Sequence, residues 1–265
     1  MLLTRVLTAA ALLTAFLSAL WFLDRTAFCV LVAACVALAG YEWALLGKSS
    51  RGSAAVYGLA CALLVLALLQ ASAAAPWIFA AASAFWVLVV PLWLGRGFEN
   101  CPAPLLPAAG ILVLVPAGIA LATLAPGEVL MLLGLVWVAD IFAYLAGRSF
   151  GKHKLAPSIS PGKTWEGVAG AVVATIIYAT IWARFDPGLA ARLQGAGWAP
   201  YLAGAVLLCA VSVLGDLFES AAKRRAGVKD SGSLLPGHGG VLDRIDSATA
   251  MLPVALLLLH AAGLR

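Results

Sequence analysis

Long apolar stretches alternate with short polar segments along the whole of this chain. A helix that crosses a bilayer needs about 20 mostly apolar residues. Nine stretches come close to that length, namely residues 6–23, 26–47, 54–72, 77–95, 105–124, 129–147, 167–184, 200–218 and 247–264. The pattern therefore predicts an all-α polytopic membrane protein with about nine transmembrane helices, which form a single membrane domain over residues 1–265.

The composition agrees with a bilayer as the solvent. Hydrophobic residues make up 63% of the chain and charged residues only 11%, whereas a soluble domain has roughly 45–50% apolar and about 25% charged residues. The net charge of +5 is carried beside the apolar stretches, where it suits anionic lipid headgroups and phosphorylated substrates. No basic stripe lies on a soluble domain, so we expect no nucleic acid as a partner.

The cysteines indicate neither a disulfide framework nor a zinc site. They include no CxxC pair, and four of the five lie inside apolar stretches, where cysteine acts as a small buried residue. The five are Cys29, Cys35, Cys61, Cys101 and Cys209.

The basic residues predict an orientation, because lysines and arginines accumulate in cytoplasmic loops. With nine spans, the N-terminus and the loops after spans two, four, six and eight face one side. That side holds 13 of the 17 basic residues, and the other holds only Arg25, Arg184, Arg192 and Arg265. We therefore expect a protein of the cell inner (plasma) membrane whose N-terminus and polar loops are cytoplasmic. The first stretch also resembles a signal peptide, but it continues to Leu23, which favours a retained helix.

Most of the polar residues fall in two segments, residues 140–167 and 212–247. Two predicted helices separate these segments, so both reach the same predicted cytoplasmic face and can build one site. The catalytic part is accordingly expected in residues 125–265, with the densest polar pattern at 220–246. Residues 1–124 carry N-terminal helices to which the sequence assigns no role.

The first polar segment begins with an acid inside a span. Asp140 lies about two turns before the end of its helix, where an ionisable group costs about 2.5–3.5 kcal/mol and usually faces a partner or a wet cavity. It shares a helix face with Tyr144 and Arg148, so burial with pairing to Arg148 or to a neighbouring helix is an alternative to a functional role. The hydroxyls, lysines and glycines that follow, including Ser160 and Lys163, suit phosphate groups.

The second segment begins with a polar stripe at the end of span eight. Its members follow at i, i+4 spacing or lie beside that row: Ser212, Asp216, Glu219, Ser220, Lys223 and Arg224. Long basic side chains that snorkel at a helix end explain the lysine and the arginine. Snorkelling does not explain Asp216, because an acid gains nothing from an anionic lipid surface.

A glycine-rich loop leads from this stripe into span nine. Pro236-Gly237 and Gly239-Gly240 enclose His238, so the backbone can approach a ligand closely. Asp243 and Asp246 lie three residues apart and share a face of the helix that begins there. Either acid could cap the helix, but two acids on either side of an arginine exceed what capping requires and favour metal ligation.

The chemistry of these side chains suits a magnesium ion. Mg²⁺ is held by carboxylates together with substrate phosphates, and a second cation is compatible with the same set. Zinc would require more histidines or thiols. The predicted metal ligands are Asp140, Asp216, Glu219, Asp243 and Asp246.

At these residues the chain resembles the phosphatidate cytidylyltransferases (CDP-diacylglycerol synthases). The signature of that family appears here as Ser220, Lys223-Arg224, Lys229-Asp230, His238-Gly239-Gly240 and Asp243-Arg244-Ile245-Asp246. A second motif of the family is similar to Asp140, Gly147-Arg148 and the stretch from Ser160 to Gly167. The resemblance covers about residues 130–265. Ala222 is a departure, because the family usually has a larger apolar residue there.

The resemblance implies that a phosphate oxygen of phosphatidate attacks the α-phosphorus of CTP and expels pyrophosphate, which gives CDP-diacylglycerol. It also implies a homodimer. The expected catalytic residues are Asp216, Lys223, Arg244 and Asp246. The expected substrate-binding residues are Arg148, Ser160, Lys163, Ser220, Arg224, Lys229, His238, Gly239 and Gly240.

Three other functions fit parts of the pattern. A different CTP-dependent lipid enzyme, such as a polyprenol kinase or an ether-lipid cytidylyltransferase, is the nearest, although the complete His-Gly-Gly and Asp-Arg-x-Asp pattern argues against the kinase. A transporter would place its polar groups near the bilayer midplane in repeated helices, whereas here they lie at one face. A headgroup-binding scaffold would not need so many acids.

The charge bias generates a testable topology. A reporter fused after Arg265 should lie outside the cytoplasm, because nine spans that start from a cytoplasmic N-terminus end on the opposite side. Paired alkaline phosphatase and green fluorescent fusions measure the location of each fusion point. A fusion after Lys154 is the matched control and should be cytoplasmic. A cytoplasmic reporter at Arg265 would contradict the predicted orientation.

Overall fold

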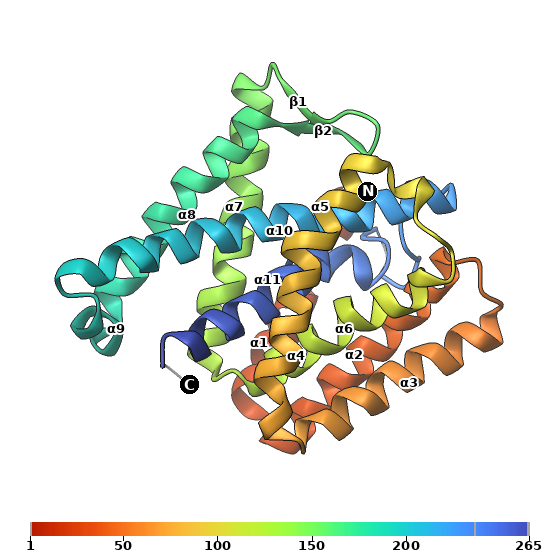
Figure 1. Cartoon of the computed structure of the whole chain (residues 1–265), viewed down its shortest axis with the longest axis horizontal. Coiled ribbons are helices and arrows are strands. Elements are labelled where there is room, and N and C mark those ends of the chain that lie inside the picture. The colour runs from red at the N-terminus through yellow and green to blue at the C-terminus, as the bar shows by residue number, and fades with distance from the viewer. Residues whose placement is uncertain (1, 236, 264–265) are drawn as a thin grey trace.

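The chain folds into a bundle of long helices, and Figure 1 shows a small strand hairpin that projects from one end of it. The computed structural model describes residues 2–235 and 237–263. Leu264 at the end of the predicted ninth span and two of the counted charges, Arg265 and the side chain of Arg5, lie outside the described residues.

Each of the nine predicted stretches corresponds to a helix. The helices are α1 (Leu2–Phe22), α2 (Arg25–Leu46), α3 (Arg51–Leu69), α4 (Ala75–Ala84) with a π-helical turn (Phe85–Val89) that continues into α5 (Val90–Arg96), α6 (Leu105–Thr123), α7 (Pro126–Phe150), α8 (Trp165–Phe185), α10 (Trp198–Ala226) and α11 (Leu242–Ala261).

Within the described residues, seven helices are long and apolar enough to cross a membrane, and Val6–Phe22 of α1 is a shorter candidate. The prediction of an all-α polytopic membrane fold is thereby confirmed. The number of nine spans stays a prediction, because α11 is not among the seven.

Two helices extend farthest beyond the apolar stretches that predicted them. α10 continues past residue 218 to Ala226, and Gly227 ends it with a φ of 78°, the left-handed conformation that commonly terminates helices. α11 starts at Leu242 rather than at residue 247. Hydropathy marks where a helix leaves apolar surroundings and not where its hydrogen bonds end. The acids and bases of the second polar segment therefore lie largely on rigid helices.

The first polar segment forms a β-hairpin that the sequence did not predict. Its strands, β1 (Lys154–Ala156) and β2 (Ser160–Thr164), pair antiparallel and connect α7 to α8. Figure 1 shows the hairpin at the tip of these two helices, far from the α9 end. The other short elements are α9 (Pro187–Arg192) and the 3₁₀ turns Ser72–Ala74, Phe98–Asn100 and Gly195–Gly197.

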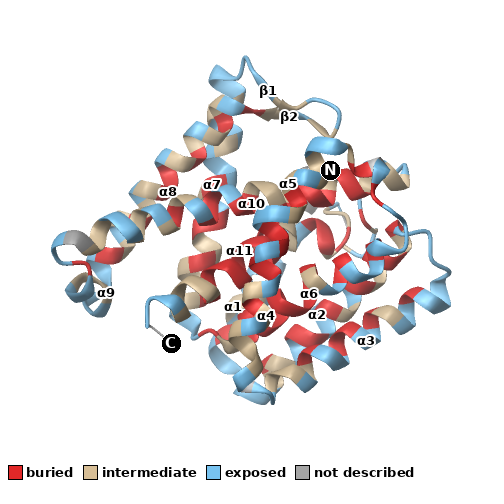
Figure 2. Cartoon of the chain, viewed as in Figure 1, coloured by how far each residue is buried: buried red, intermediate tan, exposed pale blue. Residues whose placement is uncertain are grey.

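The helix α11 lies inside the bundle. It packs against α2, α4, α6, α7 and α10, and its buried residues extend from Leu242 to Leu256. Figure 2 shows burial concentrated where these helices meet, while the tip of the hairpin and α9 are largely exposed. The N-terminal helix α2 is thus a direct neighbour of the helices that carry the predicted site.

An aromatic cluster fixes the rotation of α10. Phe218 stacks on Trp43 of α2, with ring centroids 5.7 Å apart, and it meets Trp86 and Phe98 edge-on at 5.4 and 5.1 Å. Aromatic pairs in these geometries contribute stability beyond the area that they bury. Because Phe218 lies between the acids of the predicted site, the cluster also determines which way those acids point.

Candidate active site

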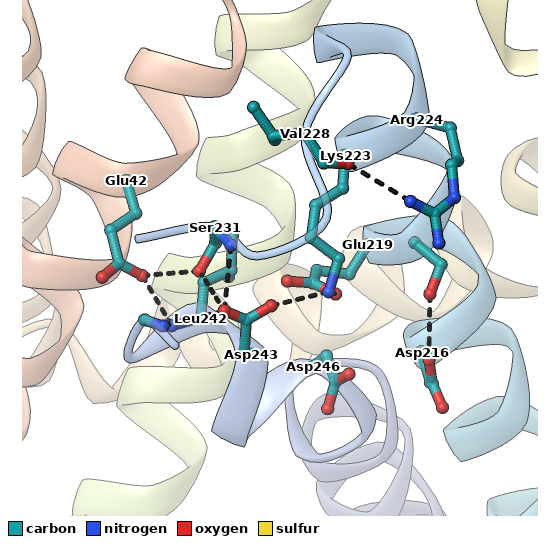
Figure 3. Close-up of polar contacts among 12 residues, drawn as sticks. Glu42, Asp216, Glu219, Lys223, Arg224, Val228, Ser231, Leu242, Asp243 and Asp246 are labelled. Carbon is teal, nitrogen blue, oxygen red and sulfur yellow. Dashed lines mark hydrogen bonds and ion pairs between the residues drawn. The ribbon is translucent and has the colours of Figure 1, made fainter. Parts of the chain in front are cut away.

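The predicted site residues of α10 and α11, among them Asp216, Asp243 and Asp246, gather where these two helices cross, as Figure 3 shows. Gly215 makes this crossing close. A Cβ atom at Gly215 would lie 2.6 Å from the carbonyl oxygen of Asp246 and 2.9 Å from the Cβ of Ala250, so no larger residue fits without moving a helix. The close approach brings Asp216, the next residue of α10, to the turn of α11 that carries Asp246.

One group of acids, which we call the three-helix acids, consists of Asp140, Asp216 and Asp246. They come from α7, α10 and α11 respectively, and the charge of Asp216 acts on both of the others. Lys163 of β2 pairs with Asp216, with Nζ and Oδ2 2.6 Å apart, and the Ser220 hydroxyl donates to Oδ1 at 3.2 Å. Several carboxylates of like charge at one place favour a bound cation.

A second group, which we call the buried triad, consists of Glu219, Lys223 and Asp243. The Lys223 ammonium lies 2.6 Å from Asp243 Oδ1 and also pairs with Glu219 one turn earlier on α10. All three charged groups are largely shielded from solvent. Two acids hold this lysine in a fixed position, because a buried charge needs such partners to offset its lost hydration.

The carboxylate of Asp243 also organises the glycine-rich loop. Its Oδ2 accepts hydrogen bonds from the Ser231 amide at 2.9 Å and from the Gly240 amide at 2.8 Å. It also lies 3.0 Å from the Ser231 hydroxyl, whose single hydrogen is shared with the carboxylate of Glu42 on α2. Asp243 lies in the first turn of α11, before the predicted span that begins at residue 247. Burial alone would raise its pKa, but the hydrogen bonds from Lys223, Gly240 and Ser231 lower that pKa to about 2. Asp243 is therefore ionised throughout the physiological range.

The structure adds one residue that the sequence analysis missed. Glu42 of α2 is 1% exposed, and its carboxylate accepts hydrogen bonds from the Ser231 hydroxyl at 2.9 Å and from the Val241 and Leu242 amides at 3.0 and 2.8 Å. Figure 3 shows it opposite Asp243, with Ser231 between them. The available signal was an acid inside an apolar stretch, which is costly unless it is satisfied.

Three glycines of the loop are required by these two carboxylates. A Cβ atom at Gly232 would lie 2.5 Å from Glu42 Oε1, and one at Gly239 would lie 2.5 Å from Asp243 Oδ2. A Cβ atom at Gly240 would collide with both Ser231 and Glu42. Gly239 also has a φ of 82°, which is unfavourable for residues with a side chain. Gly240, which the sequence analysis predicted to bind substrate, therefore packs against the buried Glu42 carboxylate.

The five predicted metal ligands do not converge on one point. They divide between the three-helix acids and the buried triad, and in the described part of the chain no three acidic, histidine or cysteine side chains stand close enough to hold a metal ion unaided. In the triad, Lys223 already lies between Glu219 and Asp243. Among the three-helix acids, the Asp140 carboxylate has no hydrogen bond or ion pair within the residues that the structure describes, and Asp246 uses one oxygen to accept the Ser247 amide.

A polar cavity of about 580 Å³ lies beside the glycine-rich loop. Four predicted functional residues meet there: Lys229, His238, Gly239 and Arg244. The remaining lining residues are Asp230, Gly232, Ser233, Leu235 and Gly237. A cavity with two cationic side chains and exposed backbone is suited to a phosphorylated ligand.

The β-hairpin is held over the end of α10. Arg224 donates from Nε to the Ile159 carbonyl at 3.2 Å and from Nη1 to the Val228 carbonyl at 3.4 Å, and Lys163 reaches Asp216. Ser160, next to Ile159, is consequently brought toward the site.

Arg148 is not brought toward the site. Its guanidinium donates to the hydroxyl of Tyr144 on its own helix at 2.8 Å. The alternative pairing of Arg148 with Asp140 is not observed either.

A second cavity of about 680 Å³ lies toward the other ends of the same helices. It is lined mainly by apolar side chains of α7, α8, α10 and α11, with Arg192 of α9 at its wall. None of the predicted site residues lines it.

Comparisons with known proteins agree with the signature residues. The sequence model of the cytidylyltransferase family matches residues 3–262. The chain is 39% identical to the phosphatidate cytidylyltransferase of Pseudomonas aeruginosa over 279 residues, which cover 99% of this chain and 98% of that protein. It is 51% identical to the Haemophilus influenzae protein of the same name over 119 residues (45% and 41% of the two chains). The Bacillus subtilis protein of that name is 46% identical over 127 residues (47% and 44%).

Proposed function

Because the chain belongs to the cytidylyltransferase family, we propose that it transfers a cytidylyl group from CTP to phosphatidate and releases pyrophosphate. The product is CDP-diacylglycerol, an intermediate of membrane phospholipid synthesis. The observation that carries this proposal is the similarity to phosphatidate cytidylyltransferases along nearly the whole chain. The polar site between α7, α10 and α11 supplies chemistry that fits the reaction.

The reaction needs charge neutralisation more than it needs a base. A phosphate oxygen of phosphatidate is already anionic, so it can attack the α-phosphorus of CTP directly. A new P–O bond forms there, the bond to the β-phosphate oxygen breaks, and pyrophosphate leaves with the electron pair. Two polyanions must be brought together in line, which is a task of positioning and electrostatic stabilisation.

The basic side chains of the protein would bind and neutralise the phosphates of the two substrates. We assign the triphosphate to the cavity of about 580 Å³, where Lys229 and Arg244 would bind its oxygens and the backbone beside His238 would donate hydrogen bonds. Lys223, which the buried triad holds in place, would stabilise charge that develops at the reacting phosphate. Lys163 and Ser160 would approach the reacting phosphates from the β-hairpin, which Arg224 orients.

The residues present fit a magnesium cofactor. Asp216 and Asp246, supported by Asp140, offer oxygen ligands alone, and Mg²⁺ commonly takes one or two carboxylates and completes its shell with water and substrate phosphates. Bound there, the ion would neutralise phosphate charge and polarise the reacting group. We revise the predicted ligand set accordingly: Glu219 and Asp243 would orient Lys223 rather than hold the cation.

The chain is a multi-pass membrane protein, which suits a substrate with two acyl chains. We place the site at the cytoplasmic face of the inner membrane, because the charge bias favours that side and CTP is a cytoplasmic nucleotide. The resemblance to the family also favours a homodimer. Multi-angle light scattering of the detergent-extracted protein tests this, and a strictly monomeric active protein would exclude it.

Metal dependence is the first test of the site. Formation of CDP-diacylglycerol from radiolabelled CTP should require Mg²⁺ or Mn²⁺, since the available ligands are oxygens. A zinc-selective chelator should have no effect, because the site has no thiol ligands. Excess EDTA should abolish product formation, and added Mg²⁺ should restore it. Full activity in EDTA without added divalent ion would refute the metal assignment.

The three-helix acids provide the second test. Asp216→Asn and Asp246→Asn should each lower kcat at least roughly a thousandfold, because the loss of about 4 kcal/mol of charge stabilisation has that effect on a rate. Asparagine keeps the volume and one acceptor oxygen but removes the charge. Near-normal turnover by Asp216→Asn, or a loss explained entirely by failure to fold, would make Asp216 an ordinary helix-pairing residue.

The matched control is Glu128→Gln. Glu128 caps the start of α7, where its carboxylate accepts the Ala125 amide at 2.8 Å, and it lies more than three turns before Asp140 on the same helix. The same loss of one charge should there leave turnover within about twofold of the unmodified protein. Size-exclusion profiles and thermal unfolding in detergent establish that each variant is folded.

A further inference from the structure

The N-terminal half of the chain contributes a carboxylate to the organisation of the site. Glu42 lies on α2, and the residues whose amides it accepts, Val241 and Leu242, lie 199 and 200 positions later. The N-cap residue of α11, Val241, has no side chain that could accept these amides. The first turn of a helix leaves such donors unsatisfied, and here a buried acid from a different helix satisfies them.

Glu42 accepts hydrogen bonds from the glycine-rich loop near both of its ends. We call the segment of residues 229–235 and 237–241 the cavity loop, because it lines most of the cavity of about 580 Å³. The Ser231 hydroxyl, which donates to Glu42, lies two residues after Lys229. The Leu242 amide, which also donates to Glu42, lies two residues before Arg244. One carboxylate therefore fixes the backbone next to both cations of the cavity.

The cavity loop is held in one conformation by the buried carboxylates of Glu42 and Asp243 and by the hydrogen bond from the Leu235 amide to the Gly239 carbonyl. It contains four glycines (Gly232, Gly237, Gly239 and Gly240), and glycine backbones have many accessible conformations. Its glycines Gly232 and Gly240 pack so closely on the Glu42 carboxylate that no Cβ atom fits. The contact therefore depends both on the length of the glutamate side chain and on the absence of a side chain at these two loop positions.

The Glu42 carboxylate is stabilised by hydrogen bonds and not by ion pairs with the cations of the cavity. In the described part of the chain it has no ion pair, and neither Lys229 nor Arg244 has one. Amide and hydroxyl donors, together with the positive end of α11, stabilise the carboxylate instead. The two cations consequently stay available for an anionic ligand, while the loop that carries them is anchored.

We propose that Glu42 is a positioning residue for the cytidylyl transfer, which fixes the cavity loop so that Lys229 and Arg244 meet the triphosphate of CTP. Glu42 itself touches no substrate. This inference rests on the proposed function, because it assigns CTP to the cavity.

The test compares Glu42→Gln with Glu42→Asp in the full-length protein in detergent. Glutamine replaces one acceptor oxygen by an NH₂ group, which opposes a backbone donor. The KM for CTP should rise at least about tenfold, a change of about 1.4 kcal/mol, while the KM for phosphatidate stays within about twofold. Aspartate keeps the charge and should recover part of the loss. Glu128→Gln, which changes a capping acid at a different helix start, should alter neither KM.

A double-mutant cycle tests the contact independently of the charge. Gly232→Ala should raise the KM for CTP, because its methyl group meets the Glu42 carboxylate. The shorter side chain of Glu42→Asp makes room for that methyl group. The double variant Glu42→Asp/Gly232→Ala should therefore be no worse than the poorer single variant, whereas independent sites would add their effects. Additive losses would overturn the proposed contact.

A local readout separates positioning from general stability and from the assigned reaction. Hydrogen–deuterium exchange should accelerate in Glu42→Gln within residues 229–242 and remain unchanged around α7 and α8. An unchanged KM for CTP in the folded Glu42→Gln variant would overturn the proposal. So would a loss of folding temperature with equal effects on both substrates in both variants. If the unmodified chain made no CDP-diacylglycerol, the proposed function would fail, and the exchange data would still decide whether Glu42 anchors the loop.

Discussion

The carboxylates of Glu42 and Asp243 lie on opposite sides of Ser231, and each collects hydrogen bonds from the same loop. Buried acids are costly unless donors satisfy them, so this arrangement forces the loop to wrap around the two side chains. The glycines of the loop, the start of α11 and the position of Lys223 all depend on that constraint. The cations that line the polar cavity are held in place as its consequence.

The acids of the site fall into two groups with different surroundings, although all of them are aspartate or glutamate. Asp243 and Glu219 are enclosed and occupied by Lys223 and backbone donors, so they determine geometry. Asp216 and Asp246 lie where three helices meet and contact Lys163, Ser220 and the Ser247 amide instead, and these are the acids to which the proposed function assigns a cation. The structure separates these roles by depth in the fold, since sequence spacing along α10 and α11 places all four acids within a few turns.

Hydropathy was sufficient to predict every long helix, because each apolar stretch must be shielded from water. It failed at the ends of α10 and α11, where the helical hydrogen bonds continue through charged residues. The hairpin at Lys154–Thr164 was missed because its strands are short and polar. The role of Glu42 could not be predicted locally, since its partners lie 199 and 200 positions away. The signature residues were recognised, but their spacing did not reveal which acids are enclosed.

The separation between Glu42 and its partners also constrains how the protein is made. The ribosome delivers α2 early, and Val241 and Leu242 emerge only with the last helix. Throughout that interval Glu42 has none of its native donors, and its carboxylate needs water or other polar partners in their place. Docking of α11 is therefore the step that gives Glu42 its native donors, and a chain that lacked α11 would leave this acid without the Val241 and Leu242 amides.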